Sequence, residues 1–265
     1  MTAMPDAYSP REVASRVRDT GIAKAHLDVF TMFTLAVLAG AFIALGAVFF
    51  IVTVTDPSTG YGVTRLLGGV AFSLGLILVI VAGAELFTGN NLVAMAWASR
   101  LVTSRELIRN WVVVYLGNAV GAVGTVALVW AANVDELAGG AVGEKALAIA
   151  ESKAALDVPE AIALGVLCNF LVCLAVWLTM AGRTVTDKIL AIIFPITAFV
   201  AIGFEHSVAN MFFLPYGVVL DGFNSSELVF DSLVNLGAVT IGNILGGTLL
   251  VAGIYWLAYL RREDT

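Results

Sequence analysis

The chain has 265 residues, of which 60% are hydrophobic and only 13% are charged, and its formal net charge at pH 7 is −6. Its mean hydropathy is +0.95. These values exclude the soluble classes, because a soluble domain of this length needs many more charged residues to cover its surface. The composition therefore predicts an integral membrane protein, in which the position of each charge matters more than the net value.

Residues 1–27 are polar and charged, and they lack the short apolar run that a signal peptide requires. Ser9 is a good N-cap, Pro10 suits the first helical position, and Glu12 completes a capping box. We therefore expect an amphipathic helix that lies against the cytoplasmic face, packed on a neighbouring element or on lipid.

Six apolar segments follow, each long enough to cross a bilayer, which takes about 20 apolar residues. They are joined by polar turns and by one long acidic stretch from Asn133 to Asp157, which we expect to be a loop. The prediction is an all-α membrane protein with a single transmembrane domain over 28–260 and a cytoplasmic tail at 261–265. The predicted spans are roughly 28–54, 64–98, 106–132, 159–181, 188–214 and 229–260.

The basic residues lie mainly on one side of this predicted topology. If the N-terminus is inside, all fourteen Lys and Arg residues except Arg65, Lys145 and Lys153 lie on the inner side. The opposite loops are rich in acidic residues. The positive-inside rule therefore predicts a multi-pass protein of the inner (cell) membrane with both termini in the cytoplasm.

The second and fifth segments share a short pattern. Gly83–Asn90 reads GAELFTGN and Gly203–Asn210 reads GFEHSVAN, so both fit G-x-E-x-x-x-x-N. The third and sixth segments also match, with GNAVG at 117–121 and GNILG at 242–246. Two matching pairs in the same order predict two halves of three helices. Because three is odd, the halves must have opposite polarity, which makes an inverted three-plus-three repeat.

Both shared patterns predict that the second and fifth helices are broken near mid-membrane. A carboxylate in hydrocarbon costs roughly 3 kcal/mol on insertion scales, so Glu85 and Glu205 need partners or a polar cavity. Paired interruptions point to a transport site, and kinked helices with polar packing are the alternative. We expect unusual dihedrals at Gly83, Gly89 and Gly203, and bonds to freed backbone groups from Thr88, Asn90, Ser207 and Asn210.

The chain has two histidines, and only one of them is predicted to lie deep in the membrane. His26 stands at the entry to the first span, as an interfacial residue would. His206 lies in the second break, where a neutral imidazole could donate a proton to a weak-acid anion or hydrogen-bond to it. A metal site is not expected, since no further ligands stand at the required spacing. Cys168 and Cys173 are five residues apart on one helix, so they point to different faces and are read as packing residues.

Apolar side chains around the breaks suggest a dry pore, because hydrophobic constrictions resist hydrated ions. Ordinary bundle packing is an equally good interpretation for any one of them. Lys153 is a cation in an acidic stretch, and a lure for anions and a solvated lysine are comparable interpretations. The apolar residues concerned are Phe72, Leu76, Leu86, Phe87, Val172 and Phe199.

No catalytic or nucleotide-binding motif is present in the sequence. There is no Walker motif, no Gly-rich dinucleotide fingerprint, no nucleophile elbow and no cofactor signature. The chain is therefore predicted not to be an enzyme, to carry no cofactor and to bind no nucleic acid. Without a domain for ATP, transport would be channel-like or driven by gradients of substrate and proton.

Three stretches resemble the formate/nitrite transporter family: AELFTGN at 84–90, LCNFLVCLAVW at 167–177 and GFEHSVANM at 203–211. The resemblance runs from about Arg11 to Arg261. It implies an aquaporin-like six-helix fold, a homopentamer with a pore in each protomer, and small monovalent anions such as formate or nitrite as substrates. Phe72, Phe199 and the motif around His206 lean towards the formate branch.

The resemblance also implies roles for individual residues. His206 matches the central pore histidine, with Glu205, Asn169 and Asn243 in the surrounding hydrogen-bond network. Thr88 matches the threonine of a gating loop, and Lys153 the lysine at the outer end of the fourth helix. The resemblance implies an outer constriction of Leu86, Val172 and Phe199 and an inner one of Phe72 and Leu76.

The hypothesis is a channel or transporter for small weak-acid anions, most readily formate, with passive passage and proton coupling through His206 as alternatives. Nitrite or hydrosulfide transport is the alternative within the family. A neutral-solute channel of the aquaporin kind should carry two Asn-Pro-Ala boxes at the breaks, and the sequence has none. A membrane scaffold without flux is the third possibility.

Overall fold

A computed structural model describes residues 7–56 and 58–261, and within these ranges every regular element is helical. Six helical stretches are long and apolar enough to cross a membrane, in agreement with the prediction. The residues 1–6 of the predicted N-terminal segment and 262–265 of the predicted tail lie outside the described residues. The six stretches are Val29–Val54, Tyr61–Ala82, Ser104–Ala131, Val158–Ala181, Val185–Ile202 and Ser226–Leu260.

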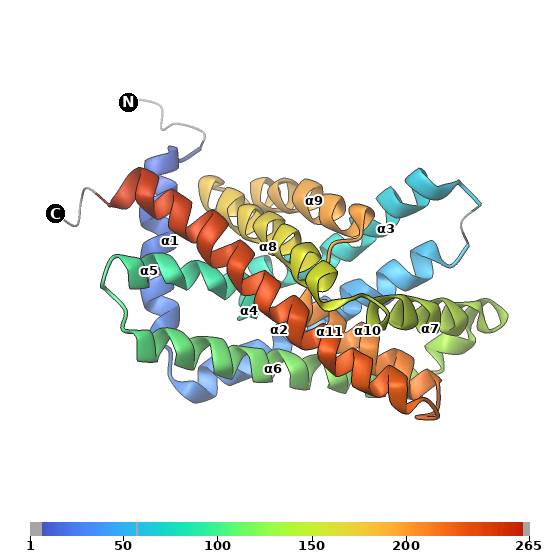
Figure 1. Cartoon of the computed structure of the whole chain (residues 1–265). Coiled ribbons are helices and arrows are strands. Elements are labelled where there is room, and N and C mark those ends of the chain that lie inside the picture. Colours follow the sequence, from blue (N-terminus) through green and yellow to red (C-terminus); the bar gives the residue numbers. More distant parts are fainter. Residues whose placement is uncertain (1–6, 57, 262–265) are drawn as a thin grey trace.

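Each half of the chain forms a three-helix group. In the first half, α2 (Val29–Val54) packs against α3 (Tyr61–Leu78) and α6 (Ser104–Ala131). In the second half, α8 (Val158–Ala181) packs in the same way against α9 (Val185–Ile202) and α11 (Ser226–Leu245). The two groups meet where α3 packs on α9 (Figure 1). The sixth span continues beyond α11 through two π-helical stretches, η4 (Gly246–Gly253) and η5 (Trp256–Leu260).

Small residues bring the helices of each group into close contact. A methyl group added at Gly121 of α6 would collide with the Val37 carbonyl of α2. One added at Gly246 would collide with the Val166 carbonyl of α8. Membrane helices approach this closely only where glycine or another small residue lines the contact. Gly121 and Gly246 are therefore packing residues.

The second and fifth spans are broken, as predicted. After α3 the chain runs through η1 (Val79–Gly83), an extended stretch, and then α4 (Phe87–Asn90), η2 (Asn91–Val93) and α5 (Ala94–Ala98). In the second half, α9 ends at Ile202 and α10 (Ser207–Leu220) begins after the break. Gly83 has a φ of +83° and Gly203 one of +94°, a region that favours glycine. The expectation for Gly89 was wrong, because it lies within α4 and has no positive φ.

Two shorter helices lie at opposite ends of the bundle. α1 (Pro10–Ala25) has the predicted capping box of Ser9 and Glu12, and it packs on η2 and α5. The expected loop of 133–157 was wrong, because it contains η3 (Val134–Gly140) and α7 (Ala141–Ala154), which packs on α10. Figure 1 shows α1 and η5, the last described helical stretch, at one end of the molecule and α7 at the other.

Candidate transport site

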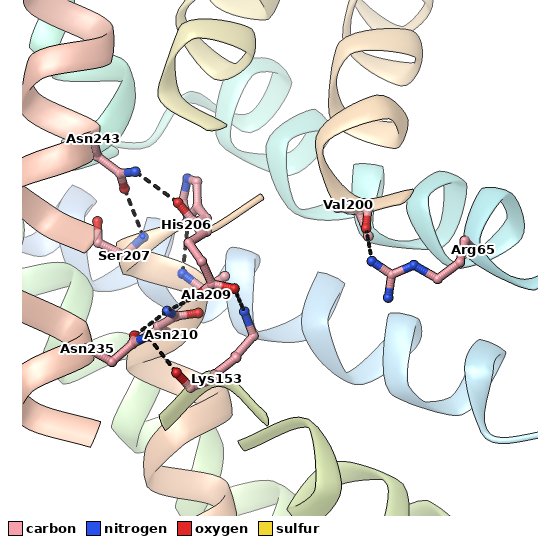
Figure 2. A network of polar contacts seen from close by, with 10 residues as sticks. Arg65, Lys153, Val200, His206, Ser207, Ala209, Asn210, Asn235 and Asn243 are labelled. Carbon is pink, nitrogen blue, oxygen red and sulfur yellow. Dashed lines mark hydrogen bonds and ion pairs between the residues drawn. The ribbon is translucent and has the colours of Figure 1, made fainter. Parts of the chain in front are cut away.

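The buried carboxylate of Glu205 sits in a closed ring of polar contacts at the second break. Lys153 donates from Nζ to Glu205 Oε1 at 2.7 Å, and Asn210 donates to Oε2 at 2.7 Å. Asn210 also donates to Asn235 Oδ1, and Asn235 donates back to the Lys153 carbonyl at 2.8 Å (Figure 2). Glu205 thereby obtains the cation and the donors that a carboxylate at membrane depth requires.

Glu85 has the same surroundings at the first break. Lys24 of α1 donates to Glu85 Oε1 at 2.5 Å, and Asn90 donates to Oε2 at 2.7 Å. Asn90 also donates to Asn110, which donates to the Lys24 carbonyl at 3.2 Å. The contacts at the two breaks thus correspond one for one, which is the pattern expected of an inverted repeat.

The backbone groups freed by the breaks are bonded by asparagines from neighbouring spans. Asn243 accepts from the Ser207 N–H at 2.9 Å and donates to the Glu205 carbonyl (Figure 2). It also donates to the Gly165 carbonyl. Asn118 does the same for the Phe87 N–H and for the Ala36 and Glu85 carbonyls. The expectation that Asn90 and Asn210 bond freed backbone groups was therefore wrong, because their amides bond the two glutamates instead. It was also wrong for the hydroxyls of Thr88, which bonds His206, and Ser207, which has no partner among the described residues.

His206 links the two breaks. Its Nε2 lies 3.0 Å from the Thr88 hydroxyl, and its Nδ1 accepts from the Ala209 N–H at 3.0 Å, so the ring caps α10. Because Nδ1 is an acceptor here, the proton of the neutral ring is on Nε2. A second proton on Nδ1 would break the cap. Of the two predicted roles, this geometry favours hydrogen-bond donation from a neutral imidazole over proton donation.

Asn169 and Cys173 hold Thr88 in place from α8. Asn169 donates to the Thr88 carbonyl at 3.3 Å and to the Asn243 carbonyl at 2.7 Å, and the Cys173 thiol donates to the Thr88 carbonyl at 3.3 Å. Both cysteines are free thiols and buried. The described residues contain no group of three or more His, Cys, Asp or Glu side chains placed to hold a metal.

Aromatic rings lie directly beside His206. Phe199 stacks on the imidazole with ring centroids 5.9 Å apart, and Phe72 meets Phe199 edge-on at 5.7 Å. The predicted grouping was therefore wrong, because Phe72 lies with Phe199 rather than in a separate constriction with Leu76. Three further predicted constriction residues are fully buried and do not line the cavity described next: Leu76, Leu86 and Val172.

A cavity of about 270 Å³ leads to these rings from the α7 end, and we call it the vestibule. Its walls include Phe72, Phe199, His206 and the ion pair of Lys153 with Glu205. The hollow beside Lys24 at the other end measures only about 30 Å³. Five of the predicted site residues thus line one cavity on the α7 side: Phe72, Lys153, Phe199, Glu205 and His206.

Three polar site residues escaped the sequence prediction: Lys24, Asn110 and Asn235. A usable signal existed, since Asn110 and Asn235 each stand eight residues before the asparagine of the paired GN motif, Asn118 or Asn243. Position in each half, rather than local composition, would have identified them.

A six-helix bundle with two broken helices meeting at a histidine below a cationic vestibule defines a multi-pass membrane transport protein. A family model described as formate/nitrite transporter matches residues 11–257. The chain is 41% identical to the formate channel FocA of Escherichia coli (strain K12), over 98% of this chain and 97% of that protein. It is 40% identical to the formate channel FocA of Haemophilus influenzae, over 92% of each. The chain belongs to the formate/nitrite transporter family.

Solved structures show the same fold. A pentameric formate channel with formate bound superposes with a TM-score of 0.79 at 42% identity, covering 88% of this chain and 98% of that one. An ion channel of the FNT family gives a TM-score of 0.83 at 29% identity, covering 93% and 98%. The predicted family and the predicted all-α membrane fold with six spans are thereby confirmed.

Proposed function

We propose that this chain is a transmembrane channel for small monovalent weak-acid anions and that formate is its main substrate. The observation that carries the proposal is the position of His206, whose Nε2 is hydrogen-bonded to Thr88 across the two breaks at the foot of the vestibule. Relatives of similar length are named formate channels, and a similar solved channel has formate bound.

The chemistry of passage follows from the surroundings of His206. A bare charge crosses apolar surroundings poorly, because burying an ion without a partner is costly. A monocarboxylate that replaces Thr88 as the partner of Nε2 would gain a hydrogen bond where Phe72 and Phe199 exclude water. Leu76, Leu86 and Val172 then form the second narrow region, on the side away from the vestibule. Thr88 and His206 together form the anion-binding site at the centre of the pore.

Assembly and orientation complete the proposal. The chain forms a homopentamer with one pore in each protomer, and the similar solved formate channel is pentameric. Both termini lie in the cytoplasm, because the excess of Lys and Arg is on the side of α1. The vestibule beside α7 then opens to the outside of the inner membrane.

The test is formate flux into proteoliposomes, with His206→Phe compared against wild type. We expect wild type to carry formate with a rate that depends on pH, and the variant to lose most of that flux or its pH dependence. His26→Phe is the matched control, since His26 is half-exposed and pairs only with Glu106 at the entry to α2. Flux that is unchanged in His206→Phe would overturn the role of His206.

Substrate identity is tested in the same vesicles. Formate, nitrite, hydrosulfide and a neutral solute such as glycerol are compared at equal concentration. The proposal requires formate to permeate at least as fast as the other anions, with glycerol excluded. Faster nitrite or hydrosulfide flux would assign the chain to another branch of the family.

A further inference from the structure

The vestibule carries positive charge that the ion pair of Lys153 does not supply. Its lining includes three cations, Arg65, Lys145 and Lys153, and one carboxylate, Glu205. The Lys153 ammonium lies 2.7 Å from Glu205, and both side chains are largely buried. At that separation each charge offsets the other's field. The uncompensated charge of the lining therefore belongs to Arg65 and Lys145.

Lys145 has no partner of its own. Among the described residues 7–56 and 58–261, no hydrogen bond or ion pair holds its Nζ. It lies on the first half of α7, partly buried, and its side chain contributes to the wall of the vestibule. Its neighbour Glu144 is exposed and does not line the cavity. Lys145 is thus a free cation at the edge of the passage.

Arg65 is held so that part of its guanidinium remains available. Its Nη2 donates to the Val200 carbonyl at 2.6 Å (Figure 2). Its Nε donates to the Ala201 carbonyl at 3.0 Å. These carbonyls end α9 directly after Phe199, where the helix dipole is negative. A guanidinium has five N–H donors, and no contact occupies Nη1 among the described residues. The helix end thereby fixes a cation at the mouth of the pore.

The two cations lie at the junction of two cavities. Both line the vestibule, and both also line a neighbouring cavity of about 190 Å³ with Tyr61 and Thr64. Phe50 and Ile149 are shared by the two cavities as well. An anion that enters from the α7 end therefore meets Arg65 and Lys145 beside apolar walls, before it reaches His206.

We propose that Arg65 and Lys145 form a capture site for a small monocarboxylate at the outer mouth, so that they, rather than Lys153, raise the local concentration of the anion. This inference rests on the proposed transport of formate. Clefts lined by one sign of charge concentrate the oppositely charged substrate. Removing one charge about 7 Å from the anion in a water-like dielectric lowers its occupancy roughly threefold.

The experiment measures initial uptake of radiolabelled formate against its concentration, in cells that lack their own formate channels. Cells keep a single orientation of the protein, and the medium can be set to low or high ionic strength with an impermeant salt. The variants are Lys145→Gln, which breaks no bond of the fold, and Arg65→Gln/Lys145→Gln. Arg65→Lys keeps the charge without the paired bonds to α9. Arg105→Gln is the matched control, since Arg105 is exposed near the start of α6, at the opposite end.

At low ionic strength we expect Lys145→Gln to raise the half-saturating formate concentration about threefold and the double variant about tenfold. Uptake at saturating formate stays at the wild-type rate, and the differences shrink in high salt because exposed charges are screened beyond about 10 Å at 0.1 M. Arg105→Gln and Arg65→Lys should stay near wild type.

Half-saturating concentrations equal to wild type in both Lys145→Gln and the double variant would overturn the capture site while leaving formate transport intact. Absence of formate uptake by the wild-type chain itself, in cells and in proteoliposomes, would overturn the proposed function and the capture site together.

Discussion

The two broken helices share one arrangement of polar contacts but lie beside different cavities. At each break a glutamate binds a lysine and an asparagine, and a second asparagine closes the ring. At each break an asparagine from the next span bonds one N–H and two carbonyls at the same distances of 2.9, 2.8 and 2.9 Å. The polar framework is therefore duplicated.

The difference lies in what each framework faces. The Glu205 ring borders a cavity of about 270 Å³ with Arg65, Lys145 and His206, whereas the hollow beside Lys24 measures about 30 Å³. The first break contributes Thr88, and the second contributes the imidazole that it meets. The repeated contacts thus bond the interrupted backbone, whereas the side chains that are not repeated line the larger cavity.

The largest expected effect is the loss of stability when the lysine of either ion pair is replaced. Lys153→Met leaves Glu205 buried without its cation, and breaking a buried pair in this way costs about 3 kcal/mol or more. Lys24→Met should cost less, because the Lys24 side chain is 27% exposed against 16% for Lys153, so water replaces it more easily. Thermal unfolding in detergent measures both, and we expect the midpoint of Lys153→Met to fall further.

A double variant separates charge from packing in that experiment. Lys153→Met/Glu205→Gln removes both charges, and it should recover much of the stability that Lys153→Met loses. Equal losses for the two lysine variants, or no recovery in the double variant, would show that the pair at the vestibule is not the more deeply desolvated one.

The second prediction concerns the two asparagines that bond the interrupted backbone, which make equivalent contacts at the two breaks. Asn243→Ala leaves the buried Ser207 N–H without its partner, and an unsatisfied buried group of this kind costs about 2 kcal/mol. Asn118→Ala removes the equivalent contacts at the first break, so the loss should be the same within about 0.5 kcal/mol. Unfolding midpoints that differ by much more would mean that the groups bonded by Asn118 and Asn243 are not equally buried, although their hydrogen-bond distances match.

The glycines at the two breaks provide a third, smaller test. Gly83→Ala and Gly203→Ala each force a side chain into the left-handed region, at a cost of about 1 kcal/mol. At Gly203 the new Cβ would also lie 3.3 Å from the Arg65 guanidinium, whereas none of the described atoms stands within 4 Å of the same position at Gly83. We therefore expect a larger fall in unfolding midpoint for Gly203→Ala. Gly89→Ala is the control, since Gly89 is helical and its Cβ would meet only Val176 at 3.6 Å.

Most of the fold could be predicted from the sequence, because apolar length and the repeated G-x-E-x-x-x-x-N pattern are local signals. The helix α7 was missed, since the acidic charges of 133–157 suggested a solvated loop. Its own signal was nevertheless present: Val142, Ala146, Ala150 and Ala154 recur every four residues and form the buried face.

The site was less accessible to prediction, because its contacts join residues far apart in the chain. The sequence analysis placed Lys153 in the acidic stretch and Glu205 in the fifth span without pairing them. The anion lure considered for Lys153 assumed a free ammonium. The partner of Lys153 depends on how α7 folds back on α10, which no local pattern encodes. The pairing of Phe72 with Phe199 likewise depends on the crossing of α3 and α9.

The smallest predicted effect concerns the short helices that hold the two lysines, α1 and α7. α1 has a capping box at Ser9 and Glu12, whereas α7 begins at Gly140 without a side-chain cap. The hydrogen bonds from the Ser9 hydroxyl and backbone lower the pKa of Glu12 below its ordinary value of 4.5. A lowered folded pKa means that the cap stabilises α1 at neutral pH, and that this contribution is lost as the pH falls from 4.5 through the folded value. Ser9→Ala should therefore speed amide hydrogen exchange in α1 at neutral pH and leave α7 unchanged. The difference between Ser9→Ala and wild type should shrink at a pH low enough to protonate Glu12. An equal difference at neutral and at low pH would assign the effect to helix propensity rather than to the cap.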